Sequence, residues 1–202
     1  MSRLDALFIN PSDQQAVYQD LSANLTALEP PVWCRLLASY VEGKGYSANI
    51  WDMQIDSSLT ALKDFIEVDD PRLIVVVVHG NQPSASTQTM PAAITLCKFL
   101  KQNFPDHPLL VVGGHPAALP ELTLRETDAD AVCTGEGPIT VLQFLRLLDT
   151  QFVKWKWLLK DVDGLCYWDH DETVRSNAAT NVADLSGEMP GGCWDLLPMS
   201  SY

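Results

Sequence analysis

A run of apolar residues that stops at two adjacent glycines is the feature that most limits how this chain can fold. In Val111–Glu121, VVGGHPAALPE, the apolar residues end abruptly at Gly113 and Gly114, and a proline-containing turn follows. A buried parallel strand ends in this way where the backbone must approach something large, because glycine has no Cβ atom. A second such end follows at Cys133–Gly137. Together they predict one binding surface at the C-terminal edge of a parallel sheet.

Strand and helix patterns alternate along the chain up to about residue 150. Expected strands are Leu4–Asn10, Ser47–Asp52, Arg72–Val78, Leu109–Val112 and Ala131–Cys133. Expected helices are Pro31–Glu42, Ser57–Ile66, Thr87–Asn103 and Pro138–Leu148. The third strand is almost wholly apolar, as expected of a central strand that helices cover on both faces. The repetition predicts an α/β, Rossmann-like (flavodoxin-like) fold: a doubly wound parallel sheet of about five strands.

The pattern changes after residue 150. Gly164–Trp168 and Thr173–Arg175 flank an acidic turn and predict a small hairpin. From Ser176 onward the chain is mostly polar and has the composition of an extended linker, which ends in an apolar cluster around Leu197. Such a cluster predicts packing on this domain or on a part of the protein beyond it. We therefore expect a domain over residues 1–150 and a small extension over residues 151–202.

Charge and composition exclude several classes of function. The chain carries 13 Lys and Arg against 26 Asp and Glu, a net charge of −13, which argues against a nucleic-acid surface. No window of about 20 apolar residues predicts a membrane span, and the N-terminus lacks a signal peptide, so a cytoplasmic location is expected. The five cysteines form no CxxC pair, which disfavours a zinc or iron–sulfur site held by this chain alone. No phosphate-loop or GxGxxG motif follows the first strand, which disfavours nucleoside triphosphates and dinucleotides.

Five polar or glycine-containing loops follow the expected strands. They are Asn10–Asp13, Asp52–Ser58, His79–Thr87, Gly113–Pro116 and Gly135–Pro138. Turns favour Gly, Pro, Asn, Asp and Ser in any protein, so a single loop of this kind indicates little. All five meet at one edge of a doubly wound sheet, where such folds bind ligands, and the set therefore favours a ligand site.

These residues carry a resemblance to a known family. The ordered segments NPSD, PPVWCRLLASYVEGKGY, IWD, VVGGHPAALPE, DAVCTGEG, DGLCYWD and CWDLLPM resemble the cobalamin (B12)-binding domain that precedes the catalytic domain in cobalamin-dependent radical S-adenosylmethionine (SAM) enzymes. The resemblance covers nearly the whole chain, and GGHPAALPE with a following GEG is its most specific part. The CxxxCxxC cluster motif of these enzymes does not occur in this sequence. The resemblance implies that the chain supplies the corrin pocket, while SAM and a [4Fe-4S] cluster are bound by a separate radical SAM domain.

The resemblance also implies which residues contact the cofactor, hydroxocobalamin or methylcobalamin. Cobalamin in such domains lies across the C-terminal edge of the sheet, with its nucleotide tail inserted along the sheet. The candidate cofactor-binding residues are Asn10, Pro11, Asp52, Gln54, His79, Ser84, Ser86, Thr87, Gly113, Gly114, His115, Gly135, Glu136 and Gly137. No residue of this chain is assigned a catalytic or metal-binding role. Methyl transfer to a substrate is the reaction that the resemblance implies.

One departure concerns the cobalt ligand. Cobalamin mutases and methionine synthase carry DxHxxG after the second strand, and its histidine binds cobalt. Here the matching stretch begins at Asp52, and Gln54 stands in place of the histidine. An amide is a poor cobalt ligand beside imidazole, so we expect base-off binding with no histidine from this loop.

Other interpretations stay open at this point. The chain could be a flavodoxin-like signalling or partner-binding domain without a cofactor, with its apolar end as the docking element. It could also be a small corrinoid carrier that acts between separate proteins, although such carriers generally supply the histidine that Gln54 replaces. His79 and His115 could simply be hydrogen-bonded loop residues, and Glu136 could pass for a general acid or base. A Cys133–His115 catalytic pair has no support in the spacing.

Overall fold

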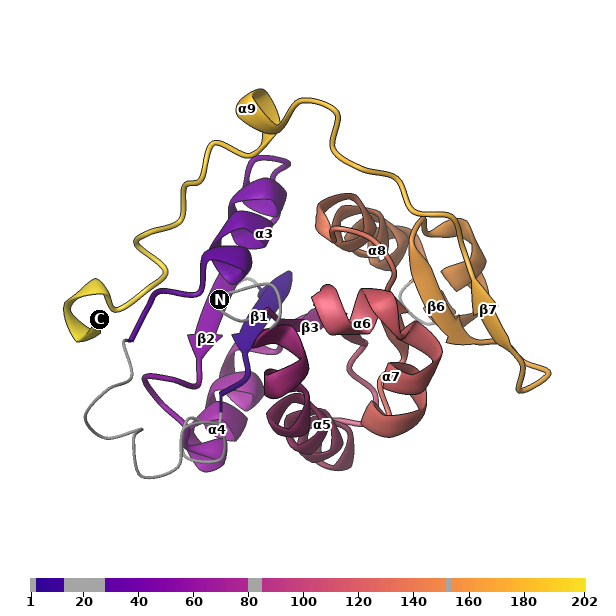
Figure 1. The fold of residues 1–202 in the computed structure, drawn as a ribbon, viewed down its shortest axis with the longest axis horizontal. Helices are drawn as coiled ribbons and strands as arrows, with labels where there is room; N and C mark the ends of the chain where they lie inside the picture. The colour runs from indigo at the N-terminus through magenta and orange to yellow at the C-terminus, as the bar shows by residue number, and fades with distance from the viewer. Residues whose placement is uncertain (1–2, 13–27, 80–84, 152–153) are drawn as a thin grey trace.

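The computed structural model describes residues 3–12, 28–79, 85–151 and 154–202 (Figure 1). Seven strands form one sheet in the order β2-β1-β3-β4-β5-β6-β7. Their bounds are β1 Ala6–Asn10, β2 Ala48–Asp52, β3 Leu73–Val78, β4 Leu109–Gly113, β5 Ala131–Cys133, β6 Leu165–Trp168 and β7 Val174–Ser176. The first five strands are parallel neighbours, and β6 and β7 join antiparallel to the far side of β5. The predicted doubly wound sheet of five parallel strands is confirmed.

Helices connect the parallel strands and cover both faces of the sheet. The helices are α3 Val32–Glu42, α4 Leu59–Asp69, α5 Ala85–Asn103, α6 Gly114–Ala118, α7 Pro120–Thr127, α8 Pro138–Gln151 and α9 Leu185–Glu188, with the 3-10 helices η2 Trp155–Asp161 and η3 Met199–Ser201. Local signals explain several of the bounds. The Ser58 side chain accepts a hydrogen bond from the Ala61 amide at 3.2 Å and caps α4. Pro120 begins α7, where its missing N–H costs nothing, and Asp128 ends that helix in the left-handed conformation.

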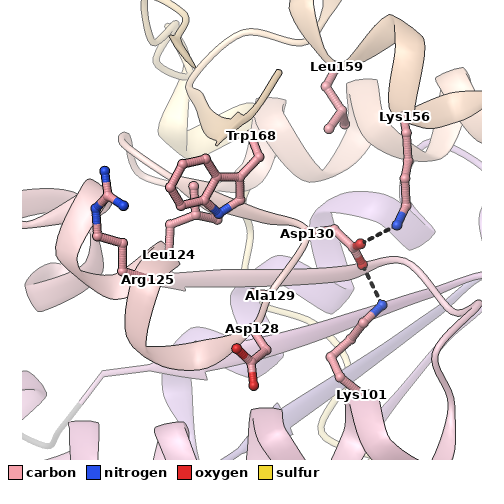
Figure 2. A pocket seen from close by; sticks show the side chains of 9 residues that line it. All are labelled: Lys101, Leu124, Arg125, Asp128, Ala129, Asp130, Lys156, Leu159 and Trp168. Carbon is pink, nitrogen blue, oxygen red and sulfur yellow. Dashed lines mark hydrogen bonds and ion pairs between the residues drawn. The ribbon is translucent and has the colours of Figure 1, made fainter. Parts of the chain in front are cut away.

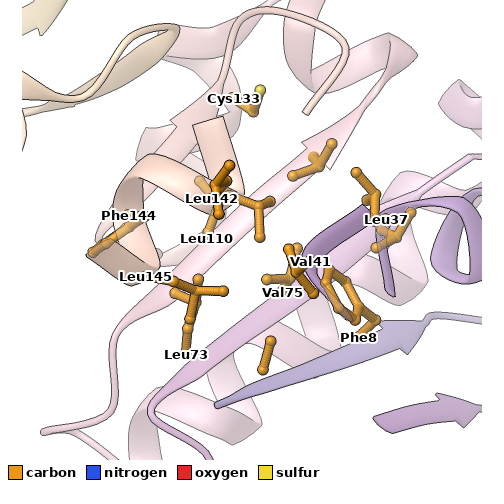
Figure 3. Packing of buried hydrophobic residues seen from close by; sticks show 14 of the residues in the cluster. Phe8, Leu37, Val41, Leu73, Val75, Leu110, Cys133, Leu142, Phe144 and Leu145 are labelled. Carbon is orange, nitrogen blue, oxygen red and sulfur yellow. The ribbon is translucent and has the colours of Figure 1, made fainter. Parts of the chain in front are cut away.

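The alternation of side chains along each strand divides the core into two layers. On one face, residues such as Phe8 and Val75 belong to one buried cluster with Leu37 of α3 and Leu145 of α8 (Figure 3). On the other face, neighbouring strand residues such as Val76 pack under α4, α5 and α7. Helices cover both faces of the sheet. A ligand can therefore contact the parallel strands only at their ends.

The predicted C-terminal hairpin forms and continues the sheet. β6 pairs with β5 through Val132 and Cys166, and β7 pairs with β6 through Tyr167 and Arg175. The hairpin therefore covers the edge of β5 that would otherwise carry unpaired backbone groups. No described helix is long and apolar enough to cross a membrane.

The segment after β7 runs back across the molecule from the hairpin, past α8 and α3, to the opposite end of the sheet (Figure 1). Arg35 of α3 donates to the carbonyl oxygens of Gly191 and Gly192, the latter at 2.9 Å. Its guanidinium carbon lies 3.9 Å from the ring centre of Trp194, and Leu197 is buried in the layer beneath α3. Of the two partners expected for the apolar end of the chain, the structure shows packing on this domain.

Candidate functional site

The C-terminal ends of the five parallel strands form one edge of the sheet. The strand register places Asn10 beside Asp52 and Val78 beside Gly113. The loops that the sequence singles out therefore do meet at one edge. The structure groups their residues into three parts: a pocket beyond β4 and β5, a hydrogen-bonded cluster beyond β1 and β2, and a second cluster that joins β3 to β4.

The pocket beyond β4 and β5 has a volume of about 460 Å³. That size lies within the range of small-molecule sites, roughly 300–1,000 Å³. It is lined by Trp33, His79, Gly113, Gly114, Ala117, Thr134, Gly135, Glu136, Ala179 and Asn181. Five of the candidate residues are in this set, and no Lys or Arg of the described chain is. The pocket is thus walled largely by backbone and small side chains.

Gly113 and Gly114 differ in their surroundings. Gly113 is buried with φ +155°, and a Cβ atom there would collide with the carbonyl oxygen of Val78. The close pairing of β3 and β4 therefore already requires glycine at this position. Gly114 is exposed at the pocket surface as the first residue of α6. Of these two pocket-lining glycines, Gly114 is the exposed one.

The glycines after β5 are constrained by packing within the chain. A Cβ atom on Gly135 would lie 2.9 Å from the Ala179 Cβ atom, so the loop touches the C-terminal segment there. Gly137 has φ +105°, and a Cβ atom would lie 2.8 Å from Cγ1 of Val112 and 3.2 Å from a methyl carbon of Leu37. Gly137 is buried and lies outside the pocket lining. The apolar core therefore closes the space beneath this loop, and the pocket opens on the Gly114 and Gly135 side.

An aromatic pair forms another wall of the pocket. The ring centres of Trp33, in the first turn of α3, and His79, directly after β3, lie 4.3 Å apart with 17° between the ring planes. Burial lowers the pKa of His79 from 6.5 to about 4, so the imidazole is neutral at pH 7. This wall is therefore flat and uncharged at neutral pH.

A hydrogen-bonded cluster centres on Asp52 at the end of β2. The carboxylate accepts from the Asn10 amide at 2.8 Å and from the backbone amide of Gln54 at 3.0 Å. It also accepts from the Tyr202 hydroxyl at 2.6 Å. Burial and this contact with the carboxylate raise the pKa of Tyr202. Asn10 and Asp52 are buried, so they hold the loop in place, whereas Gln54 is partly exposed.

The third group ties the end of β3 to the start of α6. The Ser86 hydroxyl donates to the Val78 carbonyl at 2.5 Å and accepts from the His115 amide at 2.9 Å. Ser86 is 1% exposed, so its hydroxyl has an internal role. Thr87 is exposed, and its Oγ1 lies 3.0 Å from Nδ1 of His115. Ser84 lies outside the described residues. Pro11, next to the first cluster, is buried.

Five pocket residues were not predicted from the sequence: Trp33, Ala117, Thr134, Ala179 and Asn181. Thr134 directly follows the last parallel strand and could have been found by extending the loop by one residue. Ala179 and Asn181 belong to the segment predicted as a linker. This segment passes the start of β6 directly after β7, where the Gly164 amide donates to the Ala178 carbonyl at 2.9 Å. Cys133 lies beneath the loop with its thiol 3.5 Å from Thr140 Oγ1, and burial raises the pKa of that thiol.

The known family that this chain matches is described as the B12 binding domain, and the match covers residues 18–145. The chain belongs to the B12-binding domain family. The pocket and the two clusters are therefore the C-terminal edge of a B12-binding domain. A relative from Pyrococcus horikoshii, named "Uncharacterized methyltransferase PH0819", is 31% identical over 175 residues, which is 86% of this chain and 35% of the relative. This chain thus spans about a third of the length of that relative.

Two solved structures share the fold of this B12-binding domain. The radical SAM methyltransferase TsrM from Kitasatospora setae superposes with a TM-score of 0.66 at 16% identity, over 87% of this chain and 30% of TsrM. The cobalamin-dependent radical SAM enzyme OxsB, solved with aqua-cobalamin and SAM, superposes with a TM-score of 0.63 at 16% identity, over 94% of this chain and 25% of OxsB. The resemblance drawn from the sequence is confirmed: this B12-binding domain is built like part of such enzymes.

No group of three or more His, Cys, Asp or Glu side chains in the described ranges is arranged to hold a metal ion. The four cysteines Cys34, Cys97, Cys133 and Cys166 are buried, and Cys193 is partly exposed, all as free thiols.

Proposed function

We propose that this chain holds base-off cobalamin at the C-terminal edge of its sheet and presents it to a radical SAM catalytic domain in an enzyme that transfers methyl groups. The pocket of about 460 Å³ at the ends of β4 and β5 carries the proposal. It lies at the edge where doubly wound sheets bind ligands, and its walls are backbone, small side chains, one flat aromatic pair and the polar side chains of Glu136 and Asn181.

The residues present fit a corrinoid. Gly114 is exposed in the pocket lining, and the exposed hydroxyl of Thr87 and the amide of Gln54 offer partners for the amide side chains of the corrin. No Lys or Arg is among the described pocket residues, and the tail of cobalamin carries only one phosphate charge, so a chain with few basic residues can still bind it. When bound, cobalamin would supply the methyl-carrying cobalt, and this chain would bind, orient and shield it.

The base-off state is supported by the loop after β2. Gln54 occupies the position of the cobalt-binding histidine in the DxHxxG motif, and its side-chain nitrogen lies 3.2 Å from the Glu29 carbonyl and 3.4 Å from both Asp52 carboxylate oxygens. An amide held in these contacts is a weak competitor for cobalt. Replacing it, as in Gln54→His, is expected to shift the visible spectrum of the bound corrinoid if this loop borders the cobalt. An unchanged spectrum would place Gln54 away from the metal.

The first test is direct. The 202-residue chain is mixed with hydroxocobalamin and desalted, and its visible spectrum is recorded. Retained corrin absorbance with a base-off band supports the proposal. A colourless protein would instead favour a flavodoxin-like domain that binds a protein partner without a cofactor. A base-on or histidine-ligated spectrum would favour a corrinoid carrier.

The catalytic partner is the second part of the proposal. Its support is the name of the P. horikoshii relative and the fold shared with TsrM and OxsB, in each of which the matching part is a minority of the chain. A radical SAM domain carrying CxxxCxxC, in the same longer chain or in a separate subunit, would bind SAM and the [4Fe-4S] cluster. A coding sequence that continues into such a motif, or a co-purifying subunit that carries it, would support this part.

A further inference from the structure

The C-terminal strap, defined as residues 189–202, makes little apolar contact with the rest of the domain. It follows α9, passes along α3 and ends beside the carboxyl end of β2 (Figure 1). Among the strap residues, all of which the structure describes, Leu197 alone is buried, with 6% of its surface exposed. A segment that buries so little apolar surface can lift at a low cost in free energy while the domain stays folded.

Arg35 of α3 holds the middle of the strap. Its guanidinium donates to the carbonyl oxygens of Gly191 and Gly192 and lies against the ring of Trp194. These described partners all belong to the strap, and none of them is a carboxylate. Arg35 is 7% exposed, and its Nε atom has no hydrogen-bond partner among the described residues. The closed strap therefore encloses a charge that water would solvate if the strap lifted, and this desolvation limits how tightly the strap is held.

The end of the strap covers one oxygen of the buried carboxylate at the end of β2. Oδ1 of Asp52 accepts from the Asn10 amide at 2.8 Å and from the Gln54 backbone amide at 3.0 Å. Oδ2 accepts from the Tyr202 hydroxyl at 2.6 Å, while the Gln54 side-chain nitrogen lies 3.4 Å away. Asp52 is 6% exposed. The loop after β2 thus leaves Oδ2 to the strap, and lifting the strap would uncover it.

This oxygen lies where the proposed function seats the cofactor. Asp52 pairs in register with Asn10 at the C-terminal edge of the sheet. The corrin is fringed with primary amides, whose N–H groups donate to carboxylate oxygens. A corrin amide and the Tyr202 hydroxyl would therefore compete for the same acceptor.

We propose that the C-terminal strap is an autoinhibitory latch that covers Asp52 with Tyr202 and must lift before a corrinoid can occupy the edge beside β2. The inference rests on the proposed function and adds a conformational step to it. If the strap excludes the ligand, the association rate and the apparent affinity are both reduced by the fraction of molecules in which the strap is open. Loosening the strap then speeds association and leaves dissociation unchanged.

Tyr202→Phe tests the latch, because it removes the hydroxyl and keeps the ring. Asp52 keeps its bonds from Asn10 and Gln54 in this variant. Opening is measured by hydrogen exchange of strap amides such as that of Leu197, which donates to the Trp194 carbonyl at 3.2 Å. Binding of hydroxocobalamin is followed by stopped-flow absorbance. Loss of a hydrogen bond to a carboxylate should raise both strap exchange and the association rate constant about tenfold, equivalent to ~1.4 kcal/mol, with dissociation changed less than about twofold.

A second variant and a control use other contacts of the same region. Leu197→Ala removes most of the strap's buried side chain and is expected to raise strap exchange and association at least about tenfold. Lys44→Met is the matched control. Lys44 also joins α3 to the C-terminal segment, through an ion pair with Glu188 at 2.9 Å, but both side chains are about a third exposed. Loss of this solvated pair should leave strap exchange and both rate constants within about twofold of wild type.

The outcomes separate the latch from the proposed function. Faster strap exchange without faster association in Tyr202→Phe and Leu197→Ala would overturn the latch. Faster dissociation with unchanged association would also overturn it, because the strap would then retain the ligand rather than exclude it. Unchanged exchange and unchanged rates would do the same. In each case the wild type still binds hydroxocobalamin, so the proposed function stands. If the wild type and both variants bind none, the proposed function fails and the latch fails with it.

Discussion

Two pockets, one at each edge of the sheet, differ in the residues that line them. The second pocket, about 600 Å³, lies at the N-terminal edge, where residues before β5 meet the end of α5, η2 and β6 (Figure 2). Asp130 accepts from Lys101 and Lys156 there, each at 2.9 Å. Arg125 stacks its guanidinium 4.7 Å from the ring centre of Trp168. An ion-paired Asp130 and a stacked Arg125 therefore line the larger pocket, whereas the smaller pocket is lined by glycine backbone, small side chains, an aromatic pair and the exposed Glu136.

The comparison shows that volume alone does not indicate a ligand site. A ligand in the pocket at the N-terminal edge would have to displace ion pairs around an Asp130 side chain that is 8% exposed. Breaking a buried pair costs free energy because it leaves a desolvated charge. A ligand in the pocket at the C-terminal edge displaces no ion pair of the described residues that line it. The ion pairs of the pocket at the N-terminal edge should therefore serve stability, whereas the pocket at the C-terminal edge should bind the ligand.

The largest expected effect is on stability, at Gly113. Gly113→Ala would push a Cβ atom into the Val78 carbonyl at a backbone φ of +155°, so we expect a loss of about 3 kcal/mol or more in the free energy of unfolding, measured in urea. Gly45→Ala is the control, because Gly45 has φ +92° but nothing within 4 Å of the added atom. It should cost only the strain, about 1–2 kcal/mol. Equal losses in the two variants would show that the contact with β3 contributes nothing.

Gly114→Val tests binding without testing the fold. Gly114 is exposed and helical, so valine is expected to cost less than about 1 kcal/mol of stability. Its side chain would occupy the pocket, and we expect cobalamin retention after desalting to be abolished. Gly114→Ala should have a smaller effect, which provides a size series. Wild-type retention in the valine variant would contradict a ligand beside this residue.

Lys101→Met tests the opposite pocket. Lys101 also donates to the Pro105 carbonyl at 2.8 Å, and its side chain is 16% exposed. Its loss would leave Asp130 with Lys156 and the Leu109 amide as partners, so we expect ~2 kcal/mol of destabilisation with cobalamin binding unchanged. Lys156→Met is the control, because that side chain is 59% exposed and its ion pair should contribute less than ~1 kcal/mol. Weakened cobalamin binding in Lys101→Met would mean that the two edges are coupled.

The sequence predicts the sheet better than it predicts the site. The apolar run of β3 and the glycine end of β4 identify buried parallel strands directly, because both signals are local. The segment after Gly114 was expected to be a proline-containing turn, yet it forms α6 and α7, since Pro120 occupies the first position of a helix. A glycine in the sequence does not show whether the missing side chain makes room for a ligand or for the core. At Gly137 it makes room for the core, because a Cβ atom there would be too close to Leu37 and Val112.

The residues that the sequence did not identify at the site reach it through tertiary structure. Trp33 lies in an ordinary apolar helix, and nothing local distinguishes it from a core residue. Its position against His79 depends on how α3 crosses the sheet. Ala179 and Asn181 are brought to the pocket by the C-terminal segment after it leaves the hairpin. Contacts between distant segments of this kind cannot be read from spacing along one chain.

The smallest expected effect is the pH dependence that His79 gives to stability. Its pKa is about 4 in the folded protein against 6.5 for an unburied histidine, so between these values the unfolded chain binds the proton that the folded chain does not. The free energy of unfolding of the wild type should therefore fall as the pH drops from about 6.5 to 4. Above pH 7 His79 is neutral in both states, so it should cause no such loss of stability. Its size is reduced because the ring is partly exposed.

His79→Phe keeps a flat ring against Trp33 and cannot bind the proton. The free energy of unfolding, measured in urea at pH 7, 5.5 and 4.5, should decrease less steeply for this variant than for wild type. His170→Phe is the matched control, because His170 also stacks on a tryptophan but lies exposed outside the pocket. Its pH profile should follow that of wild type. Parallel profiles for His79→Phe and wild type would mean that the imidazole is solvated enough to take up its proton in the folded state, and the wall of the pocket would then be charged in acid rather than neutral.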